Sequence, residues 1–361
     1  MLHLLLILAA LAGPAPNVHS VSVSSPQPNE VWDGQVRGHV APGPAAVVVQ
    51  AGKRRFAVPV AADGRFAGAV AGAPLGQRSI TVAGTHVGPV WSVPAGSVAA
   101  LEPDEDDPAL DHELRRLARS ATPYVGAYVH LPDGRAAEYN AGSQFEAAST
   151  LKLPIMLTWL STNEQEASET PEWDMLERIT GYSDNEAANQ VLEAVGGSDT
   201  AGAAKMVALM TSLGLTHTYM QGGYLTGAGG GPPVITVDNP PPGAYKHTTP
   251  AEMARLAGWL VAAAAGKGPL VRHGVSPHEA RELLFLMLNA RDPGLVPAGA
   301  GGLPVAHKIG WLEEANNDIA IVFTHQGPVA MAVYTNGSED GTAQTFGAAV
   351  TRAALAAARR G

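Results

Sequence analysis

The sequence predicts a two-domain protein in which a small all-β domain precedes a larger α+β domain. The chain has 361 residues, of which 46% are hydrophobic and 16% charged, as is typical of globular proteins of this length. Short Val-rich segments fill the first part, whereas the remainder has strand-like segments at both ends and helical segments between them. We expect the end strands to pair as an antiparallel five-stranded sheet, flanked by helices and interrupted by an all-helical region.

Residues 1–20 are predicted to be a signal peptide. Met1–Ala12 reads MLHLLLILAALA, an apolar run too short to span a bilayer comfortably, and small residues follow it. The run has no Lys or Arg before it, so an uncleaved anchor or a buried segment stays an alternative. We expect an exported protein, periplasmic, extracellular or at the cell surface, with no membrane span after signal removal.

Residues 21–93 are predicted to form an immunoglobulin-like sandwich. Six short segments alternate in polarity and are separated by turn residues such as Asp63-Gly64. Six or seven short strands in about 75 residues are typical of such a sandwich. No catalytic constellation occurs in it, so we expect a spacer or a module that binds the cell wall or another protein. The expected strands are Val21–Ser25, Gln35–Val40, Ala46–Gln50, Arg55–Val60, Phe66–Val70 and Ser79–Ala83.

Residues 94–108 are predicted to be a linker, because the stretch is rich in Pro and acidic residues and joins two patterned regions. The second domain is expected to cover residues 109–361. Its elements in order are a helix at 109–120, a hairpin of 124–130 and 136–140, a helical region from 149 to about 290, strands at 305–311, 318–324 and 329–335, and a helix at 343–360.

The first chemical signal is Ser149-Thr150-Leu151-Lys152 at the start of an apolar helix. Residues three apart share one helix face, so the Lys152 amine can reach the Ser149 hydroxyl. A serine hydroxyl needs a neighbouring base to become a strong nucleophile, and a buried lysine with a lowered pKa can be that base. An isolated S-x-x-K is more often a helix cap with a surface lysine, but the apolar continuation here buries the helix.

Two further signals follow the first in a fixed order. Tyr182-Ser183-Asp184-Asn185 precedes a helical run, and His307-Lys308-Ile309-Gly310-Trp311 lies on a predicted strand. Each is weak by itself, since it can be an ordinary turn or strand edge. The three together, in this order and in these contexts, are much more specific.

The pattern S-x-x-K, S-D-N and K-x-G resembles the motifs of class A β-lactamases and related penicillin-binding proteins. The resemblance covers roughly residues 110–361 and extends to three flanking segments. These segments are Tyr182–Gly197, Thr248–Ala254 and Asn317–Ala320.

The resemblance implies a role for each motif residue. Ser149 would be the nucleophile, Lys152 its base, and Ser183 a proton relay to the leaving nitrogen. The substrate would be held by Asn185 at an amide and by Lys308 at a carboxylate, beside Gly310. The backbone N–H groups of Ser149 and Trp311 would form the oxyanion hole.

Two positions depart from the family pattern. Ile309 stands where the third motif usually has Thr or Ser, so carboxylate binding is expected to be altered. No glutamate lies between Glu193 and Glu252, although class A enzymes use one there for deacylation. Asp238 is the candidate to replace it.

Composition and motif spacing argue against several classes of binding partner and cofactor. The net charge of −10 argues against nucleic acid or an anionic membrane as partner. The chain has no cysteine, and its twelve histidines show no metal-ligand spacing, so no metal or other cofactor is expected.

We expect hydrolysis of β-lactams or related amides, and thus a role in β-lactam catabolism and antibiotic response. The alternatives are a D-alanyl-D-alanine carboxypeptidase, another peptidase or esterase of this fold, and a non-catalytic protein that binds cell wall or another ligand.

Overall fold

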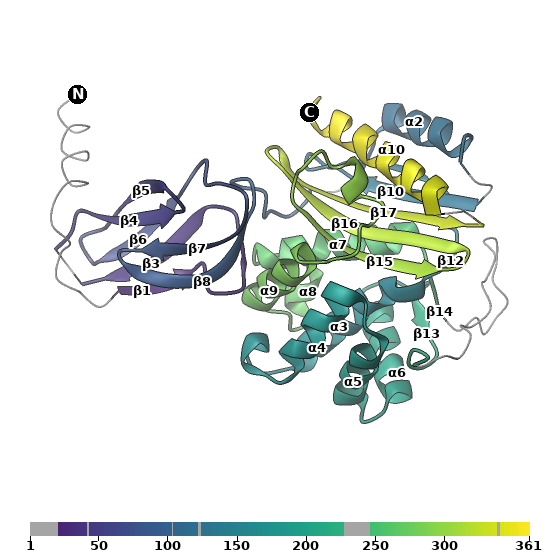
Figure 1. Cartoon of the computed structure of the whole chain (residues 1–361), viewed down its shortest axis with the longest axis horizontal. Helices are drawn as coiled ribbons and strands as arrows, with labels where there is room; N and C mark the ends of the chain where they lie inside the picture. Colours follow the sequence, from purple (N-terminus) through teal and green to yellow (C-terminus); the bar gives the residue numbers. More distant parts are fainter. Residues whose placement is uncertain (1–20, 42, 103, 122–123, 227–245, 338–339) are drawn as a thin grey trace. The chain divides into compact units, whose positions relative to one another are not determined.

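The computed structural model describes residues 21–41, 43–102, 104–121, 124–226, 246–337 and 340–361. The chain divides into two compact units, Met1–Gly96 and Ser97–Gly361 (Figure 1). The predicted signal peptide lies outside the described residues. Among the helices of the described part, none combines the length and the hydropathy needed to cross a membrane.

The first unit is all-β and contains the six strands expected from the sequence, together with two more. Its two sheets have the strand orders β1-β3-β6 and β2-β8-β7-β4-β5. Side chains of both sheets, including Val36, Phe66 and Val49, share one hydrophobic core. The immunoglobulin-like topology stays a prediction. The strands are β1 (Val21–Ser25), β2 (Val31–Trp32), β3 (Gln35–Val40), β4 (Ala46–Ala51), β5 (Arg54–Pro59), β6 (Arg65–Ala69), β7 (Gly76–Val82) and β8 (Thr85–Ser92).

Strand β8 was not expected, because Gly88 and Pro89 interrupt its apolar pattern. Proline cannot donate a ladder hydrogen bond and is therefore placed at edges or bulges. The pairing of β7 with β8 shifts register between Ser79 and Ile80, opposite Pro89 and Val87. This irregularity accommodates the proline within a long strand.

The acidic stretch predicted as a linker is mostly part of the second unit, which corrects that prediction. Glu105–Asp106 form the short strand β9, which pairs in parallel with β11 (Arg135–Tyr139). Asp107 then caps α2 (Pro108–Ala118) by accepting a 3.0 Å hydrogen bond from the Leu110 N–H. Its other oxygen lies 2.8 Å from Arg135 Nη1. The backbone of Glu105–Asp106 and the side chain of Asp107 thus bind partners that come later in the chain.

The main sheet of the second unit has the order β15-β16-β17-β10-β11-β9. The five predicted antiparallel strands are present, and β9 adds a sixth at the edge. Every residue of β16 and β17 is buried, since α2 and α10 cover one face of the sheet and α7 the other (Figure 1). The bounds are β10 (Tyr124–His130), β15 (Val305–Leu312), β16 (Ala315–Thr324), β17 (Gly327–Asn336), α7 (Pro250–Ala264) and α10 (Asp340–Ala358).

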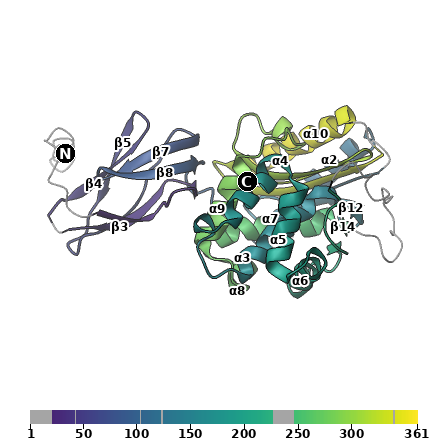
Figure 2. The same cartoon turned by 60° about the horizontal axis from the view of Figure 1, so that its bottom comes forward.

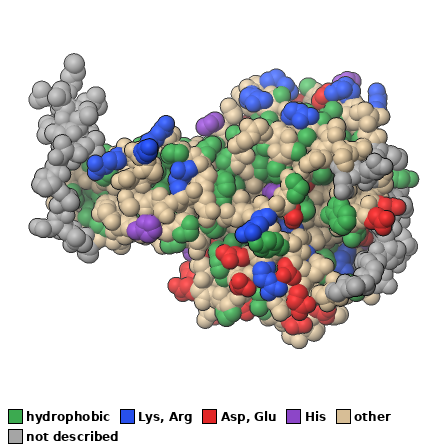
Figure 3. All heavy atoms as spheres, viewed as in Figure 1, with side chains coloured by type: hydrophobic (Ala, Val, Ile, Leu, Met, Phe, Trp, Pro, Cys, Tyr) green, Lys and Arg blue, Asp and Glu red, His purple; other side chains and the backbone are tan. Residues whose placement is uncertain are grey.

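The inserted region is mostly helical (Figure 2). It also contains strands of a small sheet of order β12-β14-β13, which corrects the prediction of an all-helical region. Acidic side chains gather over its helices on the face shown in Figure 3. The elements are β12 (Phe145–Glu146), η1 (Ala148–Leu151), α3 (Lys152–Thr162), η2 (Ala167–Glu169), α4 (Glu172–Tyr182), α5 (Asn185–Gly196), α6 (Asp199–Ser212), β13 (Tyr219–Met220), β14 (Lys246–Thr248), α8 (Pro269–Arg272), α9 (Pro277–Leu288) and η3 (Pro297–Gly299).

Candidate active site

Ser149 lies in the turn that leads into α3. It was expected to start the helix, and it lies within η1, a 3-10 turn that continues directly into α3. The preceding Ala148 has a φ of 47°, a left-handed conformation that is costly for a residue with a Cβ. Such strain persists only where surrounding contacts hold the backbone in place.

Contacts from the main sheet hold this turn. The Thr150 hydroxyl donates to the Ala147 carbonyl at 2.6 Å and lies 2.7 Å from the hydroxyl of the fully buried Tyr334 on β17. Strand β15 approaches from the other side at Gly310. A Cβ at that position would lie 2.7 Å from the Ala147 oxygen and 3.0 Å from the Thr150 nitrogen. Glycine is thus required there, because the two backbones meet.

The Lys152 side chain is completely buried and lies among oxygen atoms. Its Nζ is 2.9 Å from Ser149 Oγ, 2.7 Å from Asn185 Oδ1 and 3.2 Å from Ser183 Oγ, and it also donates to the Ser183 carbonyl. The two carbonyl-type oxygens can only accept hydrogen bonds. They can therefore take both N–H groups of a neutral amine, which leaves its lone pair for the Ser149 hydroxyl.

Burial favours that neutral form. Loss of solvation, assisted by the charge of Lys308, lowers the pKa of Lys152 to about 6. A lysine with such a pKa is mostly unprotonated at neutral pH and can accept a proton. Geometry and electrostatics thus both suit Lys152 to be the base for Ser149.

Ser183 occupies the corner between α4 and α5, in a left-handed conformation with a φ of 55°. The adjacent Asp184 caps α5 by accepting from the Ala187 N–H and is paired with Arg178 at 2.7 Å. These contacts fix the corner, so that the Ser183 hydroxyl lies between two amines.

The second amine belongs to Lys308 on β15, which is 2% exposed. Its Nζ donates to Ser183 Oγ at 2.8 Å and to the Ile309 carbonyl at 2.9 Å. Burial lowers the pKa of Lys308 to about 8. The described residues thus form a continuous chain of polar contacts from Lys308 through Ser183 and Lys152 to Ser149.

The remaining predicted site residues differ in how the structure places them. Asn185 is in contact with Lys152, and Gly310 with the Ser149 turn. Trp311 follows on β15 with a 56% exposed side chain. The predicted role of Asn185 in substrate binding stays a prediction, as does the predicted oxyanion hole. Asp238 lies outside the described residues.

The sequence analysis missed Tyr224, which lies beside the lysine. Its ring centroid is 4.6 Å from Lys152 Nζ, and its hydroxyl donates to the Ala148 carbonyl at 3.1 Å. Asn189 binds the Tyr224 backbone by accepting from its N–H at 2.6 Å and donating to its carbonyl at 2.8 Å. The signal was present in part, because Asn189 follows Asn185 by four residues and shares its helix face.

Glu146 was also missed, and it lies directly below the nucleophile turn. It is 2% exposed, and its Oε1 accepts from the Ala148 N–H at 3.3 Å. Its Oε2 is buried without a hydrogen-bond partner among the described residues. Burial raises the pKa of Glu146 to about 7, although the hydrogen bond from Ala148 and the charge of Lys246 oppose the rise.

We expect Glu146→Gln to stabilise the protein more at pH 8 than at pH 5. A carboxyl whose pKa is raised on folding contributes stability that is lost as the pH rises from its unfolded value, near 4.5, through about 7. A neutral Gln avoids that loss, which is on the order of 2–3 kcal/mol for such a shift. Thermal unfolding at both pH values measures the difference. The exposed control Glu138→Gln should show no such pH dependence, and an equal Tm change at both pH values for Glu146→Gln would contradict the prediction.

Comparisons with known proteins identify the family of the second unit. The sequence model of the Beta-lactamase enzyme family matches residues 109–170 and 162–358, which is more than half of the chain. No curated protein matches the chain significantly in sequence.

Solved structures of class A β-lactamases and of PBP-A are similar to the second unit. The last common ancestor of Gram-negative bacteria β-lactamase class A is 24% identical, with a TM-score of 0.52 over 69% of this chain and 99% of that chain. PBP-A is 22% identical, with a TM-score of 0.55 over 72% of this chain and 99% of that chain. A mutant of PBP-A, solved as its acyl-enzyme complex with penicillin G, matches at 22% identity and a TM-score of 0.55, over 72% of this chain and 100% of that chain. At these identities the likeness shows a shared β-lactamase/transpeptidase-like fold.

Proposed function

Because this chain belongs to the beta-lactamase enzyme family, we propose that it is a serine hydrolase that acts on β-lactams or related amides through an acyl-enzyme at Ser149. The observation that carries the proposal is the contact set of Lys152. Its two donor positions are taken by the Asn185 and Ser183 carbonyl oxygens, and its lone pair is left for the Ser149 hydroxyl 2.9 Å away.

In the acylation step, Ser149 Oγ attacks the amide carbonyl carbon while its proton passes to Lys152 Nζ. The carbonyl oxygen becomes an oxyanion, for which the backbone N–H groups of Ser149 and Trp311 are the proposed donors. Removal of one such donor typically costs about 3–4 kcal/mol of transition-state stabilisation. The close approach of Gly310 to the turn supports this pairing of backbones.

Collapse of the tetrahedral intermediate breaks the carbon–nitrogen bond, and the leaving nitrogen needs a proton. Ser183 Oγ is within reach of both Lys152 and Lys308, at 3.2 Å and 2.8 Å. It can donate its own proton to the nitrogen and receive the one that Lys152 took from Ser149. Lys308 then supplies positive charge for a carboxylate on the substrate.

A D-alanyl-D-alanine carboxypeptidase is the second candidate. It is favoured by the hydrogen-bond partners of Ser149 and Lys152 among the described residues, because none of them is a carboxylate that could activate a deacylating water. A slowly deacylating enzyme resembles a penicillin-binding protein more than an efficient β-lactamase.

We further propose that the protein is exported and that its first unit binds cell wall or another protein.

Intact-mass measurement with a panel of penicillins, cephalosporins and D-Ala-D-Ala peptides tests the proposal. We expect an adduct with the full mass of the added β-lactam, located at Ser149 by fragmentation of the labelled peptide. Release of D-alanine from the peptides would favour the carboxypeptidase. The control variant Ser143→Ala, in the turn before β12, should label like the wild type. Neither adduct nor hydrolysis with any member of the panel would refute the proposed function.

A further inference from the structure

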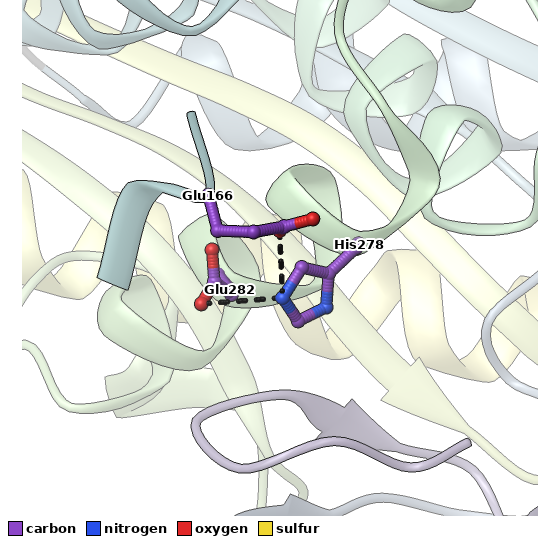
Figure 4. A group of neighbouring side chains, drawn as sticks. All are labelled: Glu166, His278 and Glu282. Carbon is purple, nitrogen blue, oxygen red and sulfur yellow. Dashed lines mark ion pairs between the residues drawn. The ribbon is translucent and has the colours of Figure 1, made fainter. Parts of the chain in front are cut away.

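A second group of chemically active side chains lies in the helical region, away from the residues described above. It consists of Glu166, His278 and Glu282 (Figure 4). His278 and Glu282 are four residues apart on α9 and therefore share one helix face. Glu166 comes from the segment between α3 and α4, immediately before η2.

The three side chains converge on one point. His278 Nε2 is 3.1 Å from Glu166 Oε2 and 3.5 Å from Glu282 Oε1, and all three ligand atoms lie within 4.8 Å of one another. Figure 4 shows both carboxylates directed toward the same ring nitrogen. One N–H of an imidazolium points in one direction, so it cannot be well aligned with both carboxylates at once.

Burial differs strongly among the three residues. The Glu282 side chain is 1% exposed, that of His278 26% and that of Glu166 54%. Transfer of a carboxylate from water into the interior is costly unless positive charge compensates it. The exposed side at Glu166 offers a cation a route to the buried Glu282.

We propose that Glu166, His278 and Glu282 bind a divalent transition-metal ion, with Zn²⁺ as the best fit. Neutral imidazole and carboxylate are ordinary Zn²⁺ ligands, at distances of about 2.0–2.2 Å. Ligand atoms at that distance in a tetrahedron are about 3.4 Å apart, which agrees with the separations of 3.1 and 3.5 Å. Water from the exposed side completes the coordination.

Such an ion has a structural role. It joins α9 to the segment that follows α3, the helix that begins at Lys152. Helix α9 in turn packs against β15, the strand of Lys308. Removal of the ion therefore lowers the stability of the helical region. The sequence analysis expected no metal because the chain has no cysteine and its histidines show no metal-ligand spacing. Glu166 comes from a distant part of the chain, so spacing could not reveal the group.

Metal binding by untagged full-length protein, stripped with EDTA and dialysed, tests the proposal. Titration calorimetry with ZnCl₂ should give one site per chain, and Zn²⁺ should raise the Tm. His278→Gln and Glu166→Gln should each weaken Zn²⁺ binding at least tenfold. Because Glu166 is half exposed, its variant should fold even if a change in the buried Glu282 did not.

His217→Gln is the matched control, because His217 also contacts a glutamate, Glu252, at 3.0 Å, but belongs to no three-ligand group among the described residues. It should bind Zn²⁺ like the wild type. Absence of a stoichiometric site in the wild type would overturn the proposal. Unchanged Zn²⁺ affinity in both His278→Gln and Glu166→Gln would overturn it as well and would identify the group as an ion-paired histidine.

Discussion

Replacement of Lys152 by Ala is expected to slow acylation of Ser149 by a β-lactam roughly 10²–10⁴-fold, the usual contribution of a general base. Ser149→Ala should form no covalent adduct at all. The reason is the position of the amine, which is buried, 2.9 Å from Ser149 Oγ, and the only base in hydrogen-bond contact with that hydroxyl among the described residues. Stopped-flow acylation by a fluorescent penicillin measures both variants.

The pH dependence of acylation provides a second readout. The rate should rise as the pH passes about 6, where Lys152 loses its proton and becomes a base. For carboxylate-bearing substrates it should fall above about 8, where Lys308 loses its charge. Neutral esters should lack much of the upper limb, since they present no carboxylate to Lys308.

The exposed Lys205 offers a matched control for Lys152, and Lys205→Ala should acylate like the wild type. If Lys152→Ala acylates at the wild-type rate with an unchanged lower pH limb, another group is the base. That result would leave Ser149 as nucleophile but would remove Lys152 from the mechanism.

Acyl-enzyme is expected to accumulate on β-lactams, because acylation outruns deacylation. Acylation needs Ser149, Lys152, Ser183 and the oxyanion hole, whereas deacylation also needs a base that activates water. No hydrogen-bond partner of Ser149 or Lys152 among the described residues is a carboxylate. Burial raises the pKa of Tyr224 well above its ordinary value, so this neighbour is neutral and is no base at pH 7.

Loss of general-base assistance costs about 10²–10⁴-fold in rate, so nitrocefin should show a burst near one equivalent of enzyme and then slow turnover. The adduct on Ser149 should be visible in the intact mass during the slow phase. Rapid sustained turnover without a burst would show that a deacylating base exists. Asp238→Asn and Glu146→Gln are then the variants to compare, and a large rate loss in one of them identifies that base.

Relations between residues close in the sequence could be predicted from the sequence itself. Ser149 and Lys152 meet because three residues make nearly one helical turn, a relation that local geometry determines. The five main strands were likewise predicted, two as a hairpin around Asp133-Gly134 and three as strand-like runs, and the antiparallel sheet followed from the need for one shared core. The three motifs were sufficient for the expected family, which the comparisons confirm.

Contacts between distant segments were decided by tertiary packing. Ser183 Oγ and Lys308 Nζ are separated by 125 residues and meet at 2.8 Å only because β15 packs beside the helical region. The resemblance to class A β-lactamases suggested that Ser183 and Lys308 share one site, whereas no local sequence pattern predicts their contact. Tyr224 and Glu146 were missed for the same reason: their roles depend on which buried neighbours surround them, and not on their spacing from Ser149.

The edge strand β9 and the group of Glu166, His278 and Glu282 show the same limit. From composition alone, an acidic stretch is predicted to be solvated. Composition gives no information on which distant residue the acidic side chains contact in the folded chain. Arg135 binds Asp107 only once the fold brings them together, and His278 likewise contacts Glu166 only in the folded chain. The sequence by itself determined the local elements and the chemistry that the motifs carry, whereas the tertiary structure decided which charges are buried, which are paired and how their pKa values shift.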